Sequence, residues 1–139
     1  MIEHIVEYLS ACPVFDGVGI NVNYLDGEAP AYSLENLAHH PVMKRYADGG
    51  MLCEKRFVLA LRKDFGRVCG RNVEVATECE QIENWIADSV SNGYLPQLPT
   101  GLKAYSLEVM KSFSVAQTAS MDVRYEAELR LVFYSDAAL

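Results

Sequence analysis

The chain has 139 residues, of which 50% are hydrophobic and 22% are charged. This length and composition predict one globular domain, residues 1–139, with a core of its own, and they argue against a disordered chain. Nineteen acidic against twelve basic residues give a net charge of −7, which argues against tight binding to nucleic-acid phosphates. No apolar run approaches the roughly 20 residues of a membrane helix, and Glu3 and Glu7 are unlike the basic start of a secretory signal. We therefore expect no membrane association.

The first third of the sequence predicts a helix followed by two short strands. Apolar residues recur at helical spacing over residues 1–11, and Cys12-Pro13 ends that helix because the residue before a proline disfavours helical geometry. Residues 20–24 and 31–35 then alternate as strands on either side of Asp26-Gly27, a dipeptide typical of tight β-turns. We expect these two strands to form a hairpin and residues 36–50 to be a connection.

The middle of the chain predicts a long strand and the main helix. Residues 51–62 place Cys53, Phe57, Leu59 and Leu61 on one face of a strand. Residues 72–91 predict an amphipathic helix that ends at Asn92-Gly93, since glycine readily adopts the left-handed backbone that follows a helix. The apolar stripe of this helix consists of Val75, Cys79, Ile82, Ile86 and Val90, with Trp85 beside it.

The last third predicts an irregular segment and two strands. Residues 94–99 contain two prolines and are expected to be irregular. A strand over residues 102–112 puts Tyr105, Leu107 and Val109 on one face, and a strand over residues 123–134 alternates apolar and charged residues. The expected fold is α+β: a mainly antiparallel sheet with two helices packed on one face.

Residues that carry chemistry do not form a recognisable motif. The four cysteines, at positions 12, 53, 69 and 79, lack the C-x-x-C spacing of zinc or redox sites, and His39 and His40 are adjacent rather than spaced as metal ligands. Cys53 or Cys69 would need a histidine base nearby to act as a nucleophile, and no spacing in the sequence places one. We therefore expect no catalytic residue, no cofactor and no metal.

Two segments have the composition of an interaction surface. The proline-stiffened segment 93–99 and the nearly uncharged segment from Phe113 to Asp122 carry large apolar side chains outside the predicted elements. We expect both segments to contact neighbouring subunits or partners through Tyr94, Leu95, Pro96, Leu98, Phe113, Val115 and Met121.

Several stretches between residues 30 and 134 resemble, in the same order, those of one family. They are YSLE at 32–35, PVMKRYADGG at 41–50, FG at 65–66, WI at 85–86, GYLPQLP at 93–99 and RYEAELRLVFY at 124–134. The chain resembles the small minor-capsid proteins of tailed phages and prophages of Gram-positive bacteria, of the tail-terminator or tail-completion type.

The resemblance implies a fold in which helices cover one face of a sheet. It also implies a non-enzymatic virion protein at the head–tail junction. It would form a ring, expected to be a hexamer, that caps or completes the tail tube and contacts tail-tube and connector proteins. The acidity would let DNA pass through the lumen without specific binding. The alternatives are a small cofactor-free enzyme of acyl-transfer type that uses a Cys or His side chain, and a generic adaptor module that binds one host or phage protein.

Overall fold

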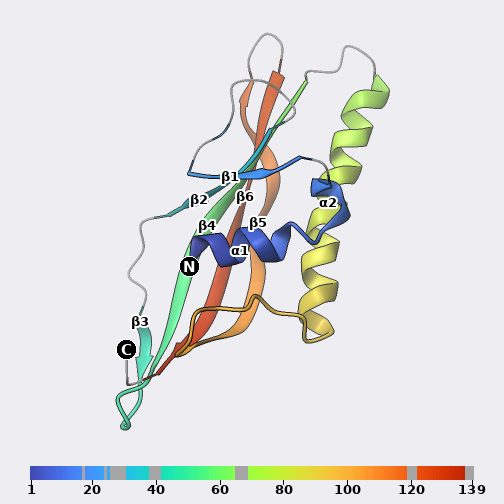
Figure 1. The fold of residues 1–139 in the computed structure, drawn as a ribbon. Coiled ribbons are helices and arrows are strands. Elements are labelled where there is room, and N and C mark those ends of the chain that lie inside the picture. The colour runs from blue at the N-terminus through green and yellow to red at the C-terminus, as the bar shows by residue number, and fades with distance from the viewer. Residues whose placement is uncertain are drawn as a thin grey trace.

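The computed structural model describes residues 1–16, 18–23, 25, 31–37, 42–64, 69–118 and 122–136. These residues form an α+β fold in which two α-helices cover one face of a six-stranded, mostly antiparallel sheet (Figure 1). The predicted fold class is thus confirmed. Along the chain the elements are α1 (Ile2–Leu9), the short 3-10 helix η1 (Pro13–Phe15), β1 (Ile20–Val22), β2 (Ala31–Asn36), β3 (Val42–Arg45), β4 (Met51–Asp64), α2 (Cys69–Ser91), β5 (Leu102–Thr118) and β6 (Asp122–Ser135).

The sheet is organised around β4 and β6, which pair antiparallel from Met51 opposite Ser135 to Asp64 opposite Asp122. The strand order is β1-β2-β4-β6-β5. β3 pairs with the beginning of β4, next to the segment that pairs with β2, so β2 and β3 share one edge of β4. β5 forms the opposite edge of the described sheet.

The core lies between the sheet and the two helices. Phe57, Leu59 and Leu61 of β4 are fully buried, as their alternation along the strand predicts. They pack with the apolar stripes of the helices and with alternate residues of β6. The largest fully buried side chains of these helices and of β6 are Ile5, Leu9, Ile82, Ile86, Leu129 and Leu131.

α2 ends where the sequence predicts, whereas α1 ends at Leu9, two residues before the end of the predicted helix 1–11. Beyond α1, the chain turns through Cys12 into η1, in which Pro13 occupies the first position, where a missing N–H costs nothing. After α2, Gly93 has a φ of +79° and donates its N–H to the Val90 carbonyl at 3.0 Å. No helix among the described residues is both long enough and apolar enough to span a membrane.

The predicted hairpin of residues 20–24 and 31–35 is wrong. β1 and β2 are neighbours but run parallel, with Ile20 opposite Tyr32, and parallel neighbours cannot be joined by a two-residue turn. Asn23 ends β1 with a φ of +55°, donates its N–H to the Leu34 carbonyl and accepts the Asn36 N–H with its side chain. These bonds keep β1 beside β2 while the backbone turns away. Asp26-Gly27 lies outside the described residues.

Two further expectations need correction. The connection predicted for residues 36–50 contains β3, which is short and interrupted by a register shift between Val42 and Lys44. In β5, a register shift between Ala104 and Ser106 reverses the alternation, so that Tyr105 is 65% exposed while Ala104 and Leu107 are buried. β5 also continues to Thr118, which makes the first half of the predicted connection Phe113–Asp122 a strand.

We expect Leu131→Ala to lower the free energy of unfolding by about 2–5 kcal/mol, since removing a fully buried leucine leaves a cavity. Val132→Ala, one residue along the same strand and only partly buried on the other face of the sheet, is the matched control and should lose less. Urea denaturation of the three proteins measures both effects. A loss below about 0.5 kcal/mol for Leu131→Ala would place this side chain outside the core.

Candidate assembly surface

β5 is a long strand at an open edge of the described sheet. Its 17 residues pair with β6 on one side, and no described strand pairs with the other side. Tyr105, Met110 and Val115 are exposed by 65%, 41% and 56%. Backbone groups and apolar side chains at such an edge favour contact with another chain.

Irregular pairing shapes this edge. The register between β5 and β6 shifts at four places, between Ala104 and Ser106, Val109 and Lys111, Lys111 and Ser114, and Val115 and Gln117. Each shift twists the strand and interrupts the regular row of backbone donors and acceptors. The bulged edge is therefore a poor template for simple strand addition, and it favours contacts made by side chains.

The predicted interface residues of β5 lie in an open groove between the strand and α2. Phe113 packs partly against the core, whereas Val115 is mostly exposed. Both line a groove of about 630 Å³ together with Tyr125 of β6 and Cys79, Glu80, Glu83 and Asn84 of α2. Met121 lies outside the described residues.

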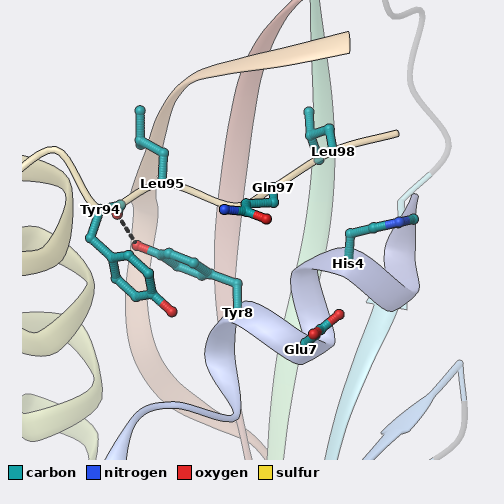
Figure 2. Close-up of a pocket in the computed structure, with 7 residues that line it drawn as sticks. All are labelled: His4, Glu7, Tyr8, Tyr94, Leu95, Gln97 and Leu98. Carbon is teal, nitrogen blue, oxygen red and sulfur yellow. Dashed lines mark hydrogen bonds between the residues drawn. The ribbon is translucent and has the colours of Figure 1, made fainter. Parts of the chain in front are cut away.

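The segment 94–99 folds back onto the helices instead of standing free. Figure 2 shows the Tyr8 hydroxyl, on α1, donating a hydrogen bond of 2.8 Å to the Tyr94 carbonyl. The rings of Tyr8 and Tyr94 lie 5.0 Å apart, and the Tyr8 ring also lies 5.2 Å from Trp85 of α2. Pro96 is buried, and Leu95 and Leu98 pack partly against the core. Of the predicted residues in this segment, Tyr94, which is 48% exposed, presents the largest apolar surface to a partner.

A second cleft separates this segment from α1. It has a volume of about 370 Å³ and is lined by His4, Glu7 and Tyr8 of α1 and by Tyr94, Leu95, Gln97 and Leu98 (Figure 2). His4 Nδ1 lies 3.8 Å from the Glu3 carboxylate, too far for a hydrogen bond. The cleft therefore pairs a few polar groups with aromatic and leucine side chains and holds no arrangement of nucleophile and base.

A nearly buried polar triad, Tyr32–Lys63–Glu78, fastens α2 to the sheet. Lys63 Nζ lies 2.6 Å from Glu78 Oε1 and 2.5 Å from the Tyr32 hydroxyl, which in turn donates to Glu78 at 2.7 Å. Burial and the hydrogen bond to Glu78 raise the pKa of Tyr32. The sequence does not reveal this triad, because its members come from β2, β4 and α2.

Charged residues cover the face of the sheet that points away from the helices. The Arg130 guanidinium contacts Glu54 and lies 3.0 Å from Glu108, and Arg56 lies 3.1 Å from Glu128. Further along the sheet, Arg124 bridges Glu35 at 2.5 Å and Glu126 at 2.7 Å. These ion pairs, all but Arg124–Glu126 between different strands, compensate one another's charge. This face is therefore neither an apolar docking surface nor a free basic one.

The cysteine side chains that the structure describes are not activated as nucleophiles. Cys12, Cys53 and Cys79 are buried free thiols, and burial raises the pKa of each, to about 12 for Cys79. A nucleophilic cysteine needs the opposite shift. Neither His39 nor His40 lies among the described residues, and the same holds for the side chain of Cys69. Within the described part of the chain, no three His, Cys, Asp or Glu side chains gather as a potential metal site.

Comparison of the sequence with protein-family models and with curated proteins finds no match.

The triad predicts how stability depends on pH. Tyr32 ionises near pH 10 in the unfolded chain and at higher pH in the folded one, so its contribution to stability is complete below about pH 10 and is lost as the pH rises. From about pH 10 to about pH 12, the free energy of unfolding should therefore fall less steeply in Tyr32→Phe than in the wild type. The slopes should differ by up to about 1.4 kcal/mol per pH unit, the value for one proton.

Urea denaturation across this pH range measures the slopes. Tyr105→Phe removes a hydroxyl from an exposed ring and serves as the control, with a slope expected to match the wild type. Equal slopes in all three proteins would contradict the assignment of this pH dependence to Tyr32.

Proposed function

We propose that this protein is a structural, non-enzymatic component of a phage or prophage virion, which assembles into a ring that caps or completes the tail tube at the head–tail junction. The observation that carries the proposal is the open β5 edge, 17 residues long, with three large apolar side chains exposed along it. A domain of this size that presents such an edge is suited to assembly with other chains.

Three further features support this function. The α+β fold agrees with the one that the resemblance to minor-capsid proteins implies. The face of the sheet that points away from the helices carries ion pairs whose charges compensate one another. Partners are therefore directed to the β5 edge and to the groove between α2 and β5. The net charge of −7 suits a lumen wall that repels DNA phosphates.

The enzyme alternative has less support. The thiols of Cys12, Cys53 and Cys79 are buried and have raised pKa values, which makes them unsuited to acyl transfer. Cys79 lines the β5 groove, but no histidine base is among the described residues that line it. An adaptor that binds a single partner would use the same β5 edge. Experiment distinguishes an adaptor from the proposed protein because an adaptor does not assemble into closed rings.

The test removes the exposed apolar side chains at this edge. In Tyr105→Ser/Val115→Ser, both substitutions replace side chains that are more than half exposed, so the circular dichroism spectrum should stay unchanged. Ring formation on tail tubes of the encoding phage, assembled without this protein, should fall at least about tenfold, the factor given by about 1.4 kcal/mol of lost contact. Electron microscopy of the tail ends and plaque counts provide the readouts.

Val22→Ser, on an exposed valine of β1 at the opposite side of the sheet, is the matched control and should complete tails normally. Normal completion by the β5 variant would place the assembly surface elsewhere. Neighbouring genes for metabolic enzymes, instead of portal, connector and tail-tube proteins, would contradict the proposed function itself.

A further inference from the structure

The groove between α2 and β5 combines apolar and acidic walls. One wall consists of Phe113 and Val115 of β5 with Tyr125 of β6, and the other includes Glu80 and Glu83 of α2. Val115 is 56% exposed and Glu80 is exposed to solvent. A segment that fits this groove would carry apolar side chains together with positive charges.

β3 and the loop that joins it to β4, residues 42–50, have this composition, and we call them together the β3–β4 turn. Met43 and Tyr46 are exposed by 45% and 38%, although each has a partner: the Met43 sulfur lies 3.6 Å from Arg130, and the Tyr46 ring lies 6.1 Å from that of Tyr134. Lys44 and Arg45 lie between them in the sequence, and both are exposed. Lys44 Nζ lies 5.2 Å from the centre of the Tyr46 ring, and Arg45 Nη1 lies 3.1 Å from the Met51 sulfur, so neither cation is paired with a carboxylate by these contacts. Figure 1 shows this turn projecting beyond the body of the sheet, at the side away from α2.

Local bonds hold the β3–β4 turn in one shape. The Tyr46 N–H donates to the Gly50 carbonyl at 2.8 Å, and the Asp48 carboxylate accepts the Gly50 N–H at 2.9 Å. Gly49 has a φ of +91°, and a Cβ on Gly50 would lie 2.2 Å from the Tyr134 hydroxyl. A projection that is already ordered loses little entropy when it docks.

The groove and the turn of one chain cannot meet. The turn adjoins Met51, whereas Val115 and Tyr125 align with Leu61, about 30 Å further along β4 at about 3.3 Å per residue. β3 and β5 also lie on opposite sides of the β4–β6 pair, about 15 Å apart at about 4.8 Å per strand. Their complementary surfaces are therefore available to a second copy of the chain.

We propose that the β3–β4 turn of one copy docks in the α2–β5 groove of the next, with Met43 and Tyr46 against the apolar wall and Lys44 and Arg45 facing Glu80 and Glu83. This inference rests on the proposed function in that it identifies the contact between subunits. The two patches differ, so the interface is heterologous and builds a ring if the rotation between copies closes. Burial is the main reason for the raised pKa of Cys79 in the groove, and the charges of Glu78 and Glu83 raise this pKa further, in agreement with a negative potential there.

Charge reversal tests the docking. Variant A is Lys44→Glu/Arg45→Glu, which makes both patches acidic, and variant B is Glu80→Lys/Glu83→Lys, which makes both basic. The wild type should associate in analytical ultracentrifugation at protein concentrations up to roughly 1 mM, where an interface with a millimolar Kd is half occupied. A alone and B alone should associate at least tenfold more weakly, and an equimolar mixture of A and B should associate again.

Matched controls separate this contact from general charge effects. Glu3→Lys/Glu7→Lys on α1 changes the net charge by the same amount as B and should associate like the wild type. Circular dichroism should show that each variant folds. If B unfolds, Glu80→Lys, on an exposed residue, takes its place and is mixed with Lys44→Glu.

Three outcomes of the solution experiment would overturn the docking. The first is a wild type that stays monomeric at roughly 1 mM. The second is association that A and B leave unchanged, and the third is a mixture that stays as weak as A and B alone. Rings that complete tails despite both reversals would contradict the docking and leave the proposed function intact. Association that follows the charge swap in a protein that does not complete tails would support the docking and contradict the proposed function.

Discussion

The structure depends on the unbroken antiparallel pairing of β4 with β6. Over the full length of both strands, every residue of one has a partner in the other without a register shift. Since side chains alternate between faces, this pairing sets Phe57, Leu59 and Leu61 in line with Leu129, Ala127 and Tyr125 on the helix side of the sheet. The helices then cover one continuous apolar strip, and the charged residues between these positions are left on the opposite face.

The pairing of β6 with β5 follows a different rule. The register shifts four times, so successive side chains of β5 do not alternate regularly between the two faces of the sheet. The shift beside Ala104 exposes Tyr105, and the others accompany exposed Met110 and Val115. An irregular edge resists stacking with the edge of another sheet but still offers apolar side chains. The same irregularity therefore limits aggregation and leaves room for a specific contact.

The sequence predicts those parts of the fold whose signal lies in residues close together along the chain. Helical spacing and strand alternation predict both α-helices, β4 and β6, and the structure buries the stripe residues Ile82 and Leu129 completely. The sequence predicts that β1 pairs with β2 but gives the wrong direction, because direction depends on the path of the chain in space, which the Asp26-Gly27 signal does not report. The face of Tyr105 was missed because a bulge shifts the alternation, and no residue type marks that bulge. The Tyr32–Lys63–Glu78 triad joins positions up to 46 residues apart, so spacing along the chain conceals it.

The candidate surface combines predicted and unexpected parts. Apolar composition in a nearly uncharged segment draws attention to Val115, which is exposed. Leu95 and Pro96 also lie in an apolar segment, but they pack partly or fully against their own chain. Composition cannot separate the two cases, because an apolar loop lowers its free energy equally well against its own core or against a neighbour. What separates them here is whether the chain itself provides a cover. α1 and α2 supply Tyr8 and Trp85 to the segment 94–99, while β5 continues to Thr118 with an open edge on its outer side. Among the described residues, the outer edge of β5, and not the segment 94–99, is therefore the part of this fold that its own chain leaves uncovered.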